Sequence, residues 1–248
     1  MSRVDSPAIY NDAFFDSVSD GALRSARVVV PILLELIQPA SVIDIGCGRG
    51  AWLRAFQENG VQTIKGFDGD YVDRSKLLID PSCFNAVNLD HCFQIESKYE
   101  LAVCLEVAEH LPTQVGKKLV STLTTAAPVV LFSAAIPGQT GPGHINEQWP
   151  WYWRTLFATH GFHRLDPIRP RVWQDTRVEW WYRQNVFLFV SEQTLAHSPK
   201  LRDERIRTDA EQLECLHPNI LLRYTTLRGM LQELPRVAWR TLQRKLNW

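Results

Sequence analysis

The sequence has no surplus of charge of either sign. Its 248 residues include 27 Lys and Arg against 27 Asp and Glu, so the formal net charge is zero with neutral histidines. Proteins that bind nucleic acid through its phosphates usually carry a basic surface, because Lys and Arg neutralise the backbone. The balanced composition gives no general attraction to nucleic acid, and we expect no DNA partner.

Cysteine is scarce and shows no paired spacing. The number of cysteines is odd, and their spacing fits neither a disulfide framework nor a zinc site. They stand at Cys47, Cys83, Cys92, Cys104 and Cys215. This pattern favours reduced thiols in a cytoplasmic protein.

Long hydrophobic runs and a targeting signal are missing as well. The most apolar early stretch, residues 28–34, is interrupted by Pro31 and followed by Glu35, and it is too short to span a bilayer. No basic segment followed by an apolar one marks the first residues. At 248 residues the chain is long enough for one α/β domain with additions, and its hydrophobic residues, 45% of the total, can fill a core.

The sequence does contain a glycine-rich turn directly after a short apolar strand. Residues 42–45 are mostly β-branched, Gly46, Gly48 and Gly50 follow, and residues 51–56 have helical character. Glycines let the backbone approach a ligand closely, and a helix N-terminus offers unpaired N–H groups. The stretch predicts a strand, a loop that cradles a ligand, and a helix.

Asp44 discriminates among the ligands that such a loop can hold. Its carboxylate, two residues before the first glycine, would repel the pyrophosphate of a dinucleotide, and the glycine spacing differs from the dinucleotide fingerprint. S-adenosylmethionine, with its ammonium and sulfonium groups, suits the site better. The stretch resembles motif I of the class I S-adenosylmethionine-dependent methyltransferases, Asp-x-Gly-x-Gly-x-Gly. The plainer alternative is a set of glycines that only closes a βα turn.

This resemblance implies a fold. We expect a doubly wound, Rossmann-like sheet of seven strands in the order 3-2-1-4-5-7-6, with the last strand antiparallel and a C-terminal helical extension. The expected domains are an N-terminal lid over residues 1–20, the S-adenosylmethionine-binding domain over residues 21–192, and the extension over residues 193–248. A surface segment packed by its aromatic residues is the alternative for the lid.

Residues at the ends of the next strands are candidates for binding the rest of the cofactor. Asp68 follows the glycines by about 20 residues, the separation at which an acid meets ribose hydroxyls in nucleotide folds, and Asp70 competes with it. The resemblance implies that Leu89 packs on adenine and that Asp90 accepts from the adenine amine. A solvated turn is the alternative for each acid.

The apolar run at residues 101–105 predicts a buried strand beside the strand expected at residues 42–45. Three polar residues follow this run: Glu106, Glu109 and His110. Their Glu-x-x-Glu-His pattern resembles that of ubiquinone-pathway O-methyltransferases and, with a distal histidine, that of small-RNA 3′-end methyltransferases. The resemblance implies a divalent metal such as Mg²⁺. Its ligands would be Glu106, Glu109, His110 and His144. Glu106 is also a candidate cofactor contact.

His144 lies in a glycine- and proline-rich stretch, residues 134–150, after the fifth predicted strand. This stretch is expected over the same sheet edge as the Glu-x-x-Glu-His pattern. His144 has three candidate roles: it completes the metal site, acts as a general base on a hydroxyl, or only hydrogen-bonds the loop to the scaffold. We expect catalysis to involve His144, His110 and Glu109.

Aromatic and basic side chains are concentrated in residues 167–184. Aromatic faces beside hydrogen-bonding groups suit a sugar or a planar acceptor, although core packing is an equally good explanation. The candidate substrate contacts are Trp180, Trp181, Tyr182 and Arg183. Trp-Trp-Tyr-Arg-Gln-Asn, with Gly-His-Ile-Asn-Glu-Gln-Trp-Pro before it, resembles a bacterial methyltransferase subgroup connected with glycan and secondary-metabolite genes.

The expected activity is O-methylation of a sugar, a glycan or a small-molecule hydroxyl. A metal-assisted RNA 2′-O-methyltransferase is one alternative, but no basic tract interleaved with aromatics crosses the catalytic half. A small-molecule or protein N-methyltransferase and a non-catalytic cofactor-binding scaffold are the others. The acids Asp44, Asp68 and Glu106 argue against the scaffold.

The C-terminal part is basic, with ten Lys or Arg and six Asp or Glu in residues 200–248. Residues 235–248 combine basic and apolar side chains as an amphipathic helix does. Such a helix can lie on the inner membrane face or bind a protein partner. The alternative is a helix that packs back on the domain.

Overall fold

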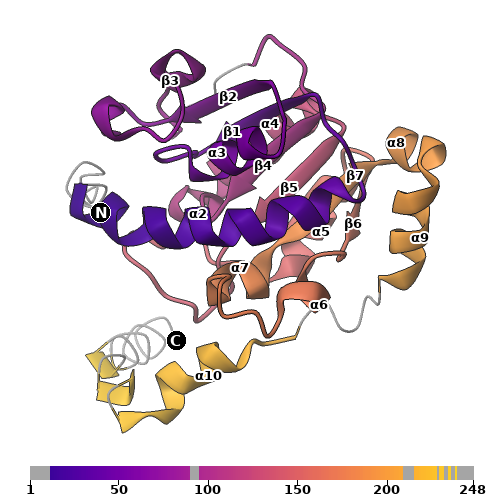
Figure 1. Ribbon diagram of the computed structural model, residues 1–248. Coiled ribbons are helices and arrows are strands. Elements are labelled where there is room, and N and C mark those ends of the chain that lie inside the picture. The colour runs from indigo at the N-terminus through magenta and orange to yellow at the C-terminus, as the bar shows by residue number, and fades with distance from the viewer. Residues whose placement is uncertain are drawn as a thin grey trace. The chain divides into compact units, whose positions relative to one another are not determined.

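The structure, a computed structural model, describes residues 12–89, 95–208, 215–227, 229–231, 234, 235 and 238 (Figure 1). The chain divides into two compact units, Met1–Glu214 and Cys215–Trp248, which are treated separately below. Residues 1–11 of the expected lid, the candidate adenine contact Asp90 and most of residues 235–248 lie outside the described residues.

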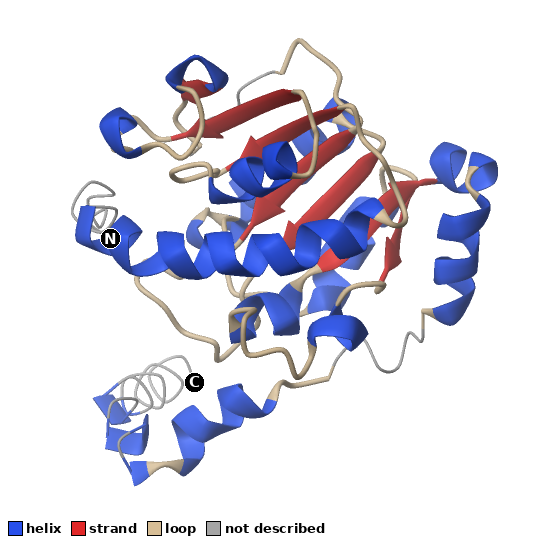
Figure 2. Cartoon of the chain, viewed as in Figure 1, coloured by secondary structure: helices blue, strands red, loops and turns tan. Residues whose placement is uncertain are grey.

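The first unit is built on a seven-stranded sheet in the order β3-β2-β1-β4-β5-β7-β6 (Figure 2). The strands are β1 (Ser41–Ile45), β2 (Thr63–Asp68), β3 (Phe84–Ala86), β4 (Leu101–Leu105), β5 (Val129–Ser133), β6 (Phe162–Leu165) and β7 (Phe187–Ser191). The first five are parallel, and β7 runs antiparallel to both β5 and β6. The predicted strand order and antiparallel last strand are confirmed.

Helices cover both faces of this sheet (Figure 2). They are α2 (Asp12–Leu34), α3 (Ala51–Glu58), α4 (Thr113–Ala126), α5 (Pro150–Ala158), α6 (Arg169–Val172), α7 (Trp180–Asn185), α8 (Glu192–His197) and α9 (Pro199–Arg207), with short 3₁₀ turns η1 (Arg74–Lys76), η2 (Pro81–Cys83) and η3 (Ala108–His110). The α2 and α3 side chains share one hydrophobic cluster, and those of α4 and α5 share another. The sheet is therefore the middle layer of three.

Strand β4 consists of apolar residues only and lacks the alternation of polar and apolar residues that a strand with one exposed face shows. All its residues are buried, and neighbouring side chains enter opposite clusters: Val103 packs with the α2 and α3 side, and Cys104 with the α4 and α5 side. A parallel strand covered on both faces favours a continuous apolar sequence.

Helix α2 contains the apolar stretch of residues 28–34. Its described part runs from Asp12 to Leu34 and continues through Pro31. Pro31 is exposed. Because proline lacks the N–H that would bond the carbonyl four residues earlier, an exposed position lets water take that place.

Helices α8 and α9 pack on the first unit through Leu195 and Leu201, which belong to the α2 and α3 cluster. In the second unit the structure describes α10 (Pro218–Thr225). Within the stretch of residues 235–248, the structure describes only Pro235 and Ala238. Among the helices of the described residues, none combines the length and apolar character that crossing a membrane requires.

Candidate functional site

The carboxyl ends of β1, β4 and β5 meet at one edge, because these three strands are parallel neighbours. Residues 46–50, the glycine loop, follow β1, and η3 follows β4. Residues 134–149, here called the histidine loop, connect β5 to α5. In open α/β sheets, this is the edge at which ligands bind.

The glycine loop has a backbone that favours glycine. Gly46, Gly48 and Gly50 have φ angles of 79°, 51° and 82°, in the left-handed region. A Cβ on Gly46 would lie 2.2 Å from Cγ2 of Val107, and one on Gly50 would lie 2.8 Å from Cγ1 of Ile79. The loop is therefore closed by steric fit, and it leads directly into the N-terminus of α3.

Two buried carboxyl groups flank this loop: Asp44 is 2% exposed and Asp68 is 5% exposed. Asp68 accepts hydrogen bonds from the N–H groups of Gly48 and Gly69 at 2.6 and 2.7 Å and from the Tyr71 hydroxyl at 2.8 Å. Burial raises its pKa, and these donors offset part of the rise. Burial and the nearby Asp68 raise the pKa of Asp44 well above its ordinary value.

These residues fit the sulfonium cofactor expected from the sequence. A cationic ligand atom beside Asp44 would favour the ionised carboxylate and so oppose the effect of burial. Asp68 stands at the end of β2, whereas the competing Asp70 is exposed in the following turn. Leu89 is partly buried and packs against the cluster that contains the α4 and α5 side chains.

Glu106, directly after β4, forms a polar cluster with two amides. Gln139 donates to Oε2 of Glu106 at 2.8 Å, and Asn185 donates to Oε1 at 3.1 Å. Asn185 also donates to the Gln139 side-chain oxygen at 2.8 Å. Glu106 has a positive φ of 56°, a conformation that costs ~1–3 kcal/mol in a residue other than glycine. The cluster offsets this strain.

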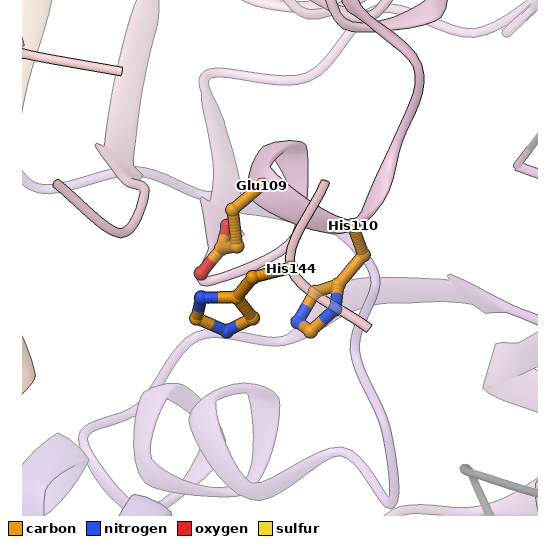
Figure 3. A group of neighbouring side chains, drawn as sticks. All are labelled: Glu109, His110 and His144. Carbon is orange, nitrogen blue, oxygen red and sulfur yellow. The ribbon is translucent and has the colours of Figure 1, made fainter. Parts of the chain in front are cut away.

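Glu109, His110 and His144 come together at the same edge (Figure 3). One ligand atom of each lies within 4.8 Å of the others. The two imidazole rings meet edge to face, with centroids 4.8 Å apart. Three of the four expected metal ligands are thus neighbours, and Glu106 is instead bonded to its two amides.

Burial shifts the pKa of two of these groups away from the ordinary value. The carboxyl group of Glu109 is fully buried, and burial together with the charge of Glu106 raises its pKa well above the ordinary value. Burial and the neighbouring His144 lower the pKa of His110 to about 4, despite a hydrogen bond with the Gly143 backbone. Burial therefore favours the uncharged form of both side chains.

Glu147 holds the histidine loop together, and the sequence analysis did not single it out. Its carboxylate accepts from the N–H groups of Gly138 and Thr140 at 2.9 and 2.6 Å, and its Oε1 lies 3.0 Å from Nδ1 of His144. Burial raises the pKa of Glu147, but these partners outweigh burial and hold it below its ordinary value. The signal in the sequence was the Gly-His-x-x-Glu spacing.

Asn146 fastens the same loop to η3. Its side chain donates to the Ala108 carbonyl at 3.1 Å and accepts from the Thr113 hydroxyl at 3.0 Å. The backbone N–H groups of Ile145 and Asn146 both donate to the Glu109 carbonyl, at 2.9 and 3.0 Å. These bonds bring His144 next to Glu109 and His110.

Two of the four candidate substrate contacts are buried. Tyr182 is 7% exposed and meets Trp52 of α3 edge to face at 5.2 Å, and burial raises the pKa of its hydroxyl. Arg183 is also 7% exposed and donates to the Trp173 carbonyl at 3.1 Å. These contacts attach α7 to its surroundings.

The other two candidates, Trp180 and Trp181, are half-buried and meet edge to face at 5.8 Å. Their exposed parts leave aromatic surface accessible at the start of α7. Trp181 also packs against the α2 and α3 hydrophobic cluster.

A family described as a methyltransferase domain matches residues 20–168, more than half of the chain. No curated protein matches the sequence. Among solved structures, magnesium protoporphyrin IX methyltransferase from Synechocystis, with bound SAH, is 17% identical with a TM-score of 0.52, covering 75% of this chain and 98% of that chain.

Two further solved structures are similar. CalS10, an amino pentose methyltransferase from Micromonospora echinaspora with bound SAM, is 13% identical with a TM-score of 0.51, covering 73% of this chain and 97% of that chain. An O-methyltransferase family protein from Burkholderia thailandensis is 11% identical with a TM-score of 0.53, covering 75% and 62%. These likenesses show the fold.

Proposed function

Because the chain belongs to the methyltransferase-domain family and is an S-adenosylmethionine-dependent methyltransferase, we propose that it methylates a hydroxyl oxygen of a sugar, a glycan or another small molecule. The observation that carries this proposal is the position of His144, a histidine bonded to a carboxylate at the same sheet edge as the glycine loop. Methylation of a hydroxyl needs a group that removes a proton, and a histidine in this setting can do so.

The residues around the glycine loop would hold the cofactor. Asp44 suits the ammonium group of the methionine part, Asp68 the ribose hydroxyls and Leu89 a face of the adenine ring. The glycines leave room for the backbone to approach. When bound, S-adenosylmethionine supplies a methyl group that its sulfonium has already activated. Glu106, fixed by two amides, would also contact the cofactor.

The remaining work of the protein is to align the acceptor, exclude water and remove a proton. Alignment contributes ~7–11 kcal/mol to such reactions, and a general base contributes ~10²–10⁴-fold. A ring nitrogen of His144 takes the hydroxyl proton as the new carbon–oxygen bond forms. Burial favours the uncharged forms of Glu109 and His110, and the carboxylate bonded to His144 is that of Glu147.

The acceptor class has support of two kinds. Half-buried Trp180 and Trp181 offer aromatic surface of the sort that packs on sugar rings. The fold is also that of CalS10, whose name describes an amino pentose methyltransferase. An N-methyl acceptor, whose nitrogen offers a lone pair, would not need the pair formed by His144 and Glu147 in the same way. An RNA 2′-hydroxyl would need it, but no basic tract interleaved with aromatics crosses the catalytic half of the sequence.

A metal-assisted reaction is a second candidate, favoured by the grouping of Glu109, His110 and His144. A metal there would lower the pKa of the acceptor hydroxyl and make a separate base less necessary. Two imidazoles and one carboxylate suit Mn²⁺, Fe²⁺ or Zn²⁺ better than Mg²⁺, which prefers oxygen ligands. The donor set therefore favours a transition metal over the Mg²⁺ expected from the sequence.

Transfer of labelled methyl from S-adenosylmethionine tests both candidates. The substrate is fractionated extract of the source organism lacking this gene, with and without a chelator. Label in carbohydrate or small-metabolite fractions supports the proposal, and loss of that label with chelator supports the metal. Label in RNA or protein contradicts the acceptor class. Tight cofactor binding without any label would favour a scaffold.

We also propose a cytoplasmic location, with residues 235–248 contacting the inner membrane face or a protein partner. The support is the basic and apolar composition of this stretch. Co-sedimentation of the full chain with anionic vesicles, compared with neutral ones, tests the membrane contact. Equal recovery with and without vesicles would contradict it.

A further inference from the structure

We propose that Glu147 is the positioning residue of His144, and that it fixes the ring with its proton on Nδ1 and its lone pair on Nε2. This inference rests on the proposed function, because it states which nitrogen of His144 serves the acceptor. It adds a residue that touches neither cofactor nor acceptor and acts through His144.

The first argument is the set of donors around Glu147. Two backbone N–H groups, those of Gly138 and Thr140, point at its two oxygens, and a backbone N–H can only donate. The carboxylate is therefore used as an acceptor at both oxygens. Its contact with Nδ1 of His144, at 3.0 Å, is satisfied when Nδ1 carries a proton.

The second argument is that this pair is screened from water. The His144 and Glu147 side chains are each 11% exposed. A hydrogen bond to a carboxylate is stronger in such a setting than at a free surface, so the preference for one tautomer is large. In the neutral ring a proton on Nδ1 leaves Nε2 as the nitrogen that accepts.

The third argument is that the ring cannot turn freely. A Cβ on Gly141 would lie 2.4 Å from Nε2 and 2.7 Å from Cε1 of His144, so the Gly141 backbone packs against the ring. His110 meets the ring edge-on from another direction. The ring is thus fixed in orientation by packing and in tautomer by Glu147.

A purely structural explanation of Glu147 would stop at its bonds to Gly138 and Thr140, which shape the loop. The two explanations make different predictions. A loop-shaping residue affects stability and every loop function alike. A positioning residue affects the turnover number kcat through His144 and leaves cofactor binding unchanged.

The first measurement is the tautomer of His144 in the full-length protein labelled with ¹⁵N-histidine. Spectra recorded at rising pH, until the His144 ring signals no longer change, report the neutral ring, and a His144→Gln variant assigns the signal. We expect the proton on Nδ1. A proton on Nε2 in the unmodified protein would overturn the inference, whether or not any variant folds.

The second measurement is a double-mutant cycle on kcat. We expect Glu147→Gln to lower kcat by ~10–100-fold with the KM for S-adenosylmethionine nearly unchanged, and to have almost no further effect in a His144→Ala background. Asn146→Ala is the matched control, since it loosens the same loop without touching the His144 ring. It should keep the Nδ1 signature.

If Glu147→Gln lowered kcat by the same factor in the unmodified protein and in the His144→Ala variant, Glu147 would be a loop-shaping residue and the proposal would be overturned. Failure of the proposed function gives a different result: no hydroxyl acceptor takes label, while the tautomer measurement, which needs no acceptor, is unaffected.

Discussion

The glycine loop and the histidine loop lie at the same edge of the sheet but are held by different means. The glycine loop is set by its backbone, with three positive φ angles and an N–H bond of Gly46 to the Phe67 carbonyl at 2.7 Å. The histidine loop also has positive φ angles, at Gly138, Thr140 and Gly143, but it is fastened in addition by its own side chains, chiefly Asn146 and Glu147. Substitutions in the first should therefore affect folding and cofactor binding, and those in the second should affect chemistry.

The largest effect is expected on the histidine side, from His144→Ala. Loss of the base should lower kcat by ~10²–10⁴-fold, while the affinity for S-adenosylmethionine stays within a few-fold. Kinetics with the identified acceptor and calorimetric titration of the cofactor measure the two quantities. Ile145→Ala, at a neighbouring side chain that is 65% exposed, is the control and should change neither. Full turnover in His144→Ala would remove the base from the mechanism.

The next effect should come from Gly46→Ala, which tests the steric closure of the glycine loop. A methyl group would meet Val107 at 2.2 Å in a left-handed conformation, so we expect a loss of ~2–4 kcal/mol in unfolding free energy and of cofactor binding. Gly60→Ala is the matched control, because Gly60 has a φ of 93° but no atom within 4 Å of the added carbon. Its cost should be backbone strain alone, ~1 kcal/mol, and equal losses would contradict the steric argument.

A third prediction concerns pH and Asp44. Since burial raises the pKa of this carboxyl in the folded protein, its contribution to stability is full below the unfolded value of ~4 and is lost as the pH rises through the raised value. Asp44→Asn should therefore stabilise the cofactor-free protein at neutral pH, less so at about pH 4, and weaken S-adenosylmethionine binding ~10–100-fold.

Thermal unfolding across pH, with and without cofactor, measures the Asp44 effect. Asp70→Asn replaces an exposed acid nearby and serves as the control, with no change expected in either quantity. A pH profile of Asp44→Asn that parallels the unmodified protein would show that the buried carboxyl does not control this dependence.

The smallest effect should come from Trp180→Ala. If its half-buried ring packs on the acceptor, the KM for the acceptor should rise by up to ~10-fold with little change in kcat. Trp151→Ala, at a tryptophan of α5 that is 54% exposed, is the control. Equal KM values in the two variants would assign Trp180 to packing.

The difference between the two loops also explains what the sequence could predict. The individual strands and the glycine loop follow from short patterns, because apolar runs and glycines act on the chain next to them, whereas the strand order was implied by the resemblance to class I methyltransferases. The cluster of Glu106 with Gln139 and Asn185 joins positions up to 79 residues apart, and no local pattern encodes such contacts. Glu147 was within a quoted motif, but its role depends on where the loop folds back.

The aromatic segment shows the same limit. Its composition suggested a substrate surface, but composition does not distinguish a ring that faces solvent from one that packs. The structure divides the set, with Tyr182 against Trp52 in the interior and Trp180 half-exposed. Burial is a property of the assembled fold, so this division could not be derived from residue types.

The late position of Asn185 in the chain sets the order in which the site is completed during synthesis. The glycine loop, Glu106 and His144 are all made earlier, and β1 to β5 can pair as they emerge. Asn185 can donate to Glu106 only after α7 has been made, and β7 then takes its place between β5 and β6. The polar cluster around Glu106 is therefore completed by a helix that is synthesised just before the last strand of the sheet.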